Sequence, residues 1–120
     1  MFELGKRYMH KEIANTIIEQ LGGNHFTTMT GAKNFSYNSA NPSGNLSFKI
    51  PQTNGINYIH ITLNSLDLYD VEYRMVRDTK KNGITNVLKA ESKNIYCDML
   101  RGSFERNTGL RTSLTRVYAD

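Results

Sequence analysis

Residues 46–63 read LSFKIPQTNGINYIHITL, and this stretch decides the fold. Apolar side chains occupy alternate positions on both sides of Asn54-Gly55, a dipeptide that strongly indicates the tight turn of a β-hairpin. Because successive side chains of a strand point to opposite faces, the alternation predicts two antiparallel strands with one buried face. Pro51 is expected to close the first strand. The side chains predicted to face the core are Leu46, Phe48, Ile50, Ile59, Ile61 and Leu63.

The same period of two continues on either side of this hairpin. The expected strands are residues 25–30, 34–38, 46–50, 58–63, 69–76 and 84–90. The first two are interpreted as halves of one strand, with Gly31-Ala32-Lys33 as a bulge or kink between them. Residues 78–83 are polar and predict a turn before the last strand. We therefore expect an antiparallel meander of four or five strands.

Two segments with helical periodicity flank the predicted sheet. In residues 9–21, apolar side chains recur every three or four positions, and Gly22-Gly23 follows as a helix end. Residues 94–108 predict a second helix that Ser92 or Asn94 would cap. The order helix, strands, helix predicts an α+β domain with both helices on one face of the sheet. Residues 1–120 are expected to form one domain, with residues 1–8 and 111–120 as flexible ends.

Composition excludes several classes of protein. The chain has 120 residues, a net charge of +4 and a sequence pI near 9.3. No apolar run approaches the roughly 18 residues of a membrane span, and no apolar stretch follows the charges at the N-terminus as in a secretory signal. A single cysteine, Cys97, excludes an internal disulfide framework and a zinc site built on cysteines.

No catalytic constellation stands out in the sequence, so we expect a non-enzymatic protein without cofactor or metal. His10, His25 and His60 fall in three different expected elements and lack metal-ligand spacing. Cys97 follows no motif that would activate a thiolate, and Asp98 beside it opposes activation. The remaining alternative is a metal-dependent nuclease built on the one carboxylate cluster, which contains Asp67, Asp70 and Glu72.

Aromatic, histidine and basic side chains on the expected open sheet face and the polar turn make a binding site the favoured interpretation. Bases stack on aromatic rings while cations neutralise phosphates, so the mixture suits single-stranded nucleic acid. It equally suits a protein interface, where Tyr and Arg supply most of the binding energy. The candidate binding residues are Lys49, Tyr58, His60, Arg74, Arg77, Lys80, Lys81 and Lys89.

Five segments together resemble a group of small proteins encoded by bacteriophages, prophages and other mobile elements. They are IIEQLGGN (17–24), MTGAKNF (29–35), LDLYDVEY (66–73), YCDMLR (96–101) and TGLRTSL (108–114). The resemblance extends from about Lys11 to Leu114. It implies a mobile-element protein located in a bacterial cytoplasm, and it carries no catalytic residue with it.

Three functions are therefore compatible with this sequence. The favoured one is a non-catalytic phage-type protein that binds and inhibits a host defence protein, as anti-CRISPR proteins do. The alternative is a nucleic-acid-binding accessory protein of phage replication, recombination or transcription. The nuclease is the third. No membrane partner is expected, and a homodimer stays open because a Tyr-rich sheet edge or face would allow two copies to pair.

Overall fold

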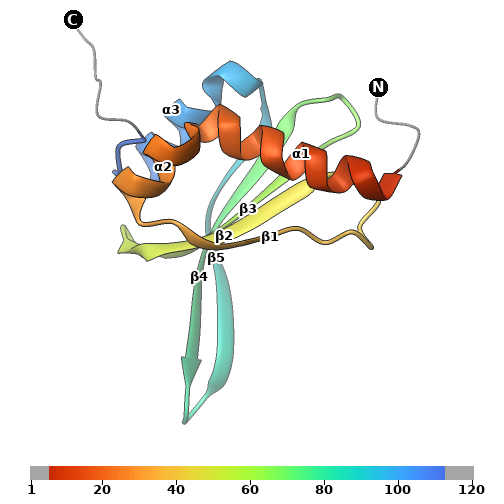
Figure 1. The fold of residues 1–120 in the computed structure, drawn as a ribbon. Helices are drawn as coiled ribbons and strands as arrows, with labels where there is room; N and C mark the ends of the chain where they lie inside the picture. The colour runs from red at the N-terminus through yellow and green to blue at the C-terminus, as the bar shows by residue number, and fades with distance from the viewer. Residues whose placement is uncertain (1–5, 113–120) are drawn as a thin grey trace, which may run out of the picture.

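The computed structural model describes residues 6–112 and has the predicted α+β architecture. Within these residues, a five-stranded antiparallel meander in the order β1-β2-β3-β4-β5 is covered on one face by three α-helices (Figure 1). The helices are α1 (Lys6–Leu21), α2 (Gly23–Thr30) and α3 (Leu100–Thr108), with a 3-10 turn η1 (Cys97–Met99) before the last. The strands are β1 (Lys33–Ser36), β2 (Asn45–Thr53), β3 (Ile56–Leu63), β4 (Tyr69–Thr79) and β5 (Gly83–Ile95).

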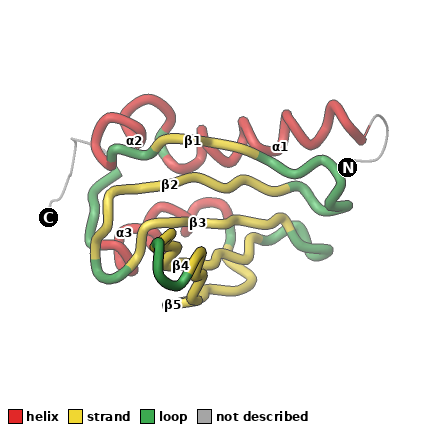
Figure 2. The backbone as a smooth tube through the Cα atoms, turned by 90° about the horizontal axis from the view of Figure 1, so that it is seen from below, coloured by secondary structure: helices red, strands yellow, loops and turns green. Residues whose placement is uncertain are grey.

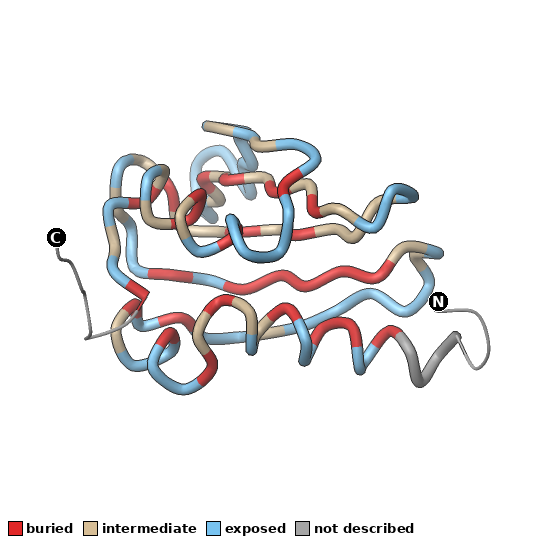
Figure 3. The backbone as a smooth tube through the Cα atoms, turned by 90° about the horizontal axis from the view of Figure 1, so that it is seen from above, coloured by how far each residue is buried: buried red, intermediate tan, exposed pale blue. Residues whose placement is uncertain are grey.

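The core lies between the helices and the sheet. Phe48 of β2 lies opposite Ile59 of β3, which lies opposite Tyr73 of β4. The ring of Phe26 on α2 packs edge-on against Phe48, with 5.4 Å between centroids, and against Phe104 of α3 at 5.1 Å. Buried positions follow the helix surfaces that face the sheet and the central strands (Figure 3). The predicted alternation between residues 46 and 63 is therefore confirmed.

The hairpin at Asn54-Gly55 is also confirmed. Both residues have positive φ angles, 53° and 73°, as the favoured two-residue turn requires. Pro51 does not close β2, which continues to Thr53. The reason is that β1 pairs with β2 only as far as Lys49, so no neighbour on that side needs the N–H that Pro51 lacks.

Residues 25–30, predicted as a strand, form the helix α2 instead. Phe26 and Thr30 are buried one helical turn apart, and the Thr30 hydroxyl donates to the Phe26 carbonyl oxygen at 2.7 Å. Gly31 then ends the helix in the left-handed conformation, with φ of 73°. Burial of Phe26 in the aromatic core thus overrides the strand preference of the threonines.

The second predicted helix begins later than expected. Asn94 and Ile95 belong to β5, and α3 starts only at Leu100. Ile95 is buried opposite Tyr69, and the backbone N–H of Asn94 donates to the Asp70 carboxylate at 3.0 Å. Neither Ser92 nor Asn94 therefore caps a helix. The expected flexible ends lie largely outside the described residues, and α1 begins at Lys6, three residues before the expected start.

The far ends of β4 and β5 project from the sheet as a two-stranded ribbon, here called the arm (residues 76–88). Pairing between β3 and β4 ends at Tyr58 and Arg74, whereas β4 and β5 pair onward to Thr79 and Gly83. The arm extends away from the side that the helices cover (Figure 1), and the first three strands lie side by side beyond it (Figure 2). Within residues 6–112, no helix is long and apolar enough to cross a membrane.

Candidate binding site

Strand pairing brings several predicted binding residues together on the open face, which is the face opposite the helices. Lys49 lies opposite Tyr58, and Tyr58 lies opposite Arg74, so the three form one row across β2, β3 and β4. His60 lies in the next row, opposite Ser47 and Glu72. These residues alternate with core residues, so their side chains point away from the helices.

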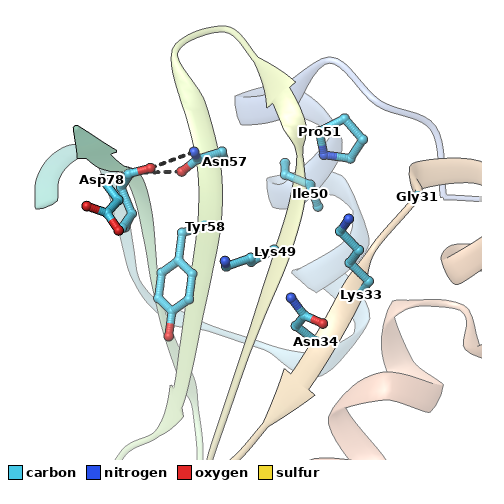
Figure 4. Close-up of a pocket in the computed structure, with 10 residues that line it drawn as sticks. Gly31, Lys33, Asn34, Lys49, Ile50, Pro51, Asn57, Tyr58 and Asp78 are labelled. Atoms are coloured by element: carbon cyan, nitrogen blue, oxygen red, sulfur yellow. Dashed lines mark hydrogen bonds between the residues drawn. The ribbon is translucent and has the colours of Figure 1, made fainter. Parts of the chain in front are cut away.

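A hollow of about 480 Å³ lies on this face beside the arm, and we call it the open-face hollow (Figure 4). Lys33 and Lys49 come from the β1–β2 side, while Val76 and Asp78 come from the arm. The Tyr58 ring stands between them, with the Lys49 side chain pointing toward it. The lining is completed by Gly31, Asn34, Ile50, Pro51 and Asn57. The hollow therefore combines two cations, one carboxylate, an aromatic ring and amides.

Asn57 holds the arm beside the hollow. Its side-chain amide donates to the Val76 carbonyl oxygen at 2.8 Å, and its side-chain oxygen accepts from the Val76 N–H at 2.8 Å. The two bonds replace the backbone pairing that β3 and β4 would otherwise make at this position. The start of the arm is thereby tied to β3, which keeps that wall of the hollow in place.

His60 is held in the sheet surface. Its Nδ1 lies 2.7 Å from the Ser47 hydroxyl and its Nε2 lies 3.3 Å from the Thr62 hydroxyl. Burial lowers the pKa of His60 below its usual value; nearby Glu72 works against this shift and Arg74 adds to it. The imidazole is therefore a neutral, half-buried part of the sheet near pH 7.

Arg74 already has partners within the protein. Its Nε donates to the Glu72 carboxylate at 2.9 Å, and one terminal nitrogen donates to the Asn86 side-chain oxygen at 3.1 Å. Glu72 therefore offsets part of the charge that Arg74 brings to the open face. An anionic ligand gains less from Arg74 than from a cation without such a partner.

The remaining predicted residues lie away from the open-face hollow. Arg77, Lys80 and Lys81 are exposed on the arm and its turn. Lys89 lies against Gly55 at the β2–β3 turn, where its Cε is 3.4 Å from the place a Gly55 Cβ would take. The reason is a bulge in β5, because Leu88 rather than Lys89 lies opposite Arg74.

Lys33, Asn57 and Asp78 line the hollow and were not among the predicted binding residues. Lys33 was interpreted as part of a bulge, although it begins β1 beside Lys49. Its place in a basic–aromatic row follows only from the pairing of β1 with β2. The role of Asn57 could have been suspected from the sequence, because it is an amide just after a hairpin turn and such side chains often take the place of backbone hydrogen-bond partners.

Two members of the carboxylate cluster, Asp70 and Glu72, have partners within the protein. Asp70 accepts hydrogen bonds from Asn64 and from the Asn94 backbone, and Glu72 pairs with Arg74. Across residues 6–112, no group of three His, Cys, Asp or Glu side chains is arranged to hold a metal ion. Cys97 is exposed as a free thiol.

Comparison with known proteins found no matching family model, no matching characterised protein and no matching solved structure.

Proposed function

We propose that the protein binds single-stranded nucleic acid in the open-face hollow. The observation that carries this proposal is that Lys33, Lys49 and Tyr58 follow one another across β1, β2 and β3 and line one space of about 480 Å³. Ligand sites of this kind are typically about 300–1,000 Å³, so one base stacked on Tyr58 fits the dimensions. The two lysines are positioned to neutralise the flanking phosphates.

The charge distribution supports the same partner. Residues 74–89 carry five basic groups and one acidic group, while the rest of the chain carries equal numbers of each. The net positive charge therefore lies on and beside the arm that walls the hollow. A nucleic-acid strand leaving the hollow along the arm passes Arg77, Lys80 and Lys81, which are exposed.

The test is fluorescence anisotropy with labelled single-stranded and duplex DNA between about 50 and 200 mM salt, where phosphate-driven binding weakens steeply. Lys49→Ala is expected to weaken binding and lower the salt slope by about 0.7, the value for one phosphate contact on a single strand. Tyr58→Ala is expected to weaken it about 5- to 150-fold, as for the loss of one stacked base, and Tyr58→Phe much less.

Lys11→Ala is the matched control, because Lys11 is an exposed lysine on α1, on the helical side of the sheet. It changes the net charge as much as Lys49→Ala does but leaves the hollow intact. Absence of binding at about 50 mM salt, or equal effects of the two lysine variants, would overturn the proposal.

A second candidate is the phage-type inhibitor of a host defence protein. It is favoured by exposed aliphatic side chains on the arm beside its basic turn: Ile84, Val87 and Leu88 are 73%, 50% and 43% exposed. Exposed apolar side chains flanked by charges are typical of protein interfaces. This candidate predicts that the chain captures one bacterial protein, that Ile84→Lys abolishes the capture, and that Tyr58→Ala leaves it intact. Nucleic-acid binding, in contrast, should be weakened by Tyr58→Ala and not by Ile84→Lys.

A further inference from the structure

The outer edge of β5 is open along the arm. β5 is the last strand of the sheet, and within residues 6–112 no strand pairs with its outer side. Proteins usually protect such edges with charges, prolines or bulges. Residues 83–88 (GITNVL) contain no charge and no proline, and their pairing with β4 is regular from Gly83 to Leu88. The bulges of β5 occur only beyond Leu88.

The backbone groups of this edge point outward. Val76 uses its N–H and C=O for Asn57, on the β3 side, so it does not use them for β5. In an antiparallel ladder, two residues directly opposite one another either both bond across the gap or both point away from it. Asn86 lies opposite Val76, so its N–H and C=O point to the open edge. Because the direction of these groups alternates along a strand, the backbone N–H and C=O groups of Ile84 and Leu88 also point to the open edge.

We propose that two copies of this chain pair through this edge, antiparallel, with the two-fold axis at Asn86. Ile84 then lies opposite Leu88 of the second copy, and Asn86 lies opposite its own counterpart. Each of these pairs would exchange both backbone hydrogen bonds, because the groups already point outward. The side chains of Ile84, Asn86 and Leu88 share one face, so the exposed apolar groups of one copy would cover those of the other.

Charge favours this orientation. The antiparallel pairing places the basic turn at Lys80 and Lys81 of each copy at opposite ends of the joined ribbon, about 30 Å apart at strand spacing. That separation exceeds the Debye length of roughly 8 Å at physiological salt. A parallel pairing would bring the two basic turns together.

The test is sedimentation velocity of the full chain from about 1 µM to 1 mM, the range in which weak interfaces associate. Ile84→Lys with Leu88→Lys places like charges opposite one another in both pairs, and we expect at least tenfold weaker association. Ile84→Lys with Leu88→Glu places opposite charges there, and we expect association to return. Asn82→Lys, at the exposed turn, is the charge control and is expected to leave association unchanged.

A backbone variant tests the same edge without added charge. Asn86→Pro removes an N–H that β4 does not use, so the arm should keep its fold by circular dichroism while the dimer is lost. Asn86→Ala loses the bond from Arg74 but keeps the N–H, and it is expected to dimerise. The inference would be overturned if the wild-type chain stays monomeric at about 1 mM. It would also be overturned if the two double variants at Ile84 and Leu88 associate with equal strength. The pairing does not rest on nucleic-acid binding, which the variants at Tyr58 and Lys49 report separately.

Discussion

The half-buried side chain of His60 makes the stability of the folded protein depend on pH. Burial lowers its pKa in the folded protein, so the unfolded chain takes up the proton first as the pH falls. Stability from the neutral imidazole is therefore fully present above pH 6.5, the usual value. It is lost as the pH falls from 6.5 toward the lower pKa of the folded state.

The pH dependence gives a prediction for His60→Gln. The variant keeps a polar side chain near Ser47 but cannot titrate, so its free energy of unfolding should change less than that of the wild type below pH 6.5. Urea unfolding from about pH 7.5 to pH 5 measures the difference. Equal pH dependence in the two proteins would contradict a stabilising role for the neutral His60 imidazole.

Among the residues that the structure describes, Asp78 is the one carboxylate that lines the open-face hollow. A phosphate bound by Lys33 and Lys49 would meet this charge as repulsion of about 1 kcal/mol in a solvated setting. Asp78→Asn is therefore expected to tighten nucleic-acid binding about fivefold in the anisotropy titration. Asp98→Asn, which removes an exposed charge from η1, is the control and should change the affinity little.

At the scale of elements, the amide of Asn57 ties the arm to β3. Asn57→Ala removes both hydrogen bonds to Val76 and is expected to cost about 1–3 kcal/mol. Hydrogen exchange should show faster exchange at the start of the arm, and nucleic-acid affinity should fall because Val76 and Asp78 line the hollow. Thr62→Ala, on the same strand, is the control and should leave exchange in the arm unchanged.

Adding a methyl group is expected to have opposite effects on stability at two glycines, Gly44 and Gly102. A Cβ on Gly44 would lie 2.5 Å from Cδ1 of Ile13, which is buried in the core on α1. Gly44→Ala is therefore expected to lower the free energy of unfolding by about 1–3 kcal/mol. Gly102→Ala, inside α3, meets only the end of the Arg106 side chain and should raise it by up to about 1 kcal/mol. Urea unfolding of both variants tests the opposite signs.

At the scale of the molecule, the aromatic cluster joins α2, α3 and the sheet into one core. Phe104 is buried and its ring centroid lies 5.1 Å from that of Phe26 and 6.3 Å from that of Phe48. Phe104→Ala is expected to cost about 3–5 kcal/mol, a large part of the stability of a small domain. Chemical unfolding measures it, and Ile84→Ala on the exposed arm should cost far less because little buried area is lost.

The sequence by itself determined the strands and turns whose pattern is local. Alternation between residues 46 and 63, the Asn54-Gly55 turn, and helices ending at Leu21 and Thr108 follow from neighbouring side chains, and the structure agrees with them. The open-face positions of Lys49, Tyr58 and His60 follow from the same alternation. Side-chain periodicity is a local property, so it can be recognised without knowing what the element packs against.

Only the tertiary structure decided the features that depend on distant partners. Residues 25–30 became a helix because Phe26 is buried against Phe48 and Phe104, and β5 extends to Ile95 because Tyr69 lies opposite it. The hollow exists because strand pairing places Lys33 beside Lys49 and Asn57 ties the arm to β3. These arrangements are set by contacts between residues far apart in the chain, which local preferences do not encode.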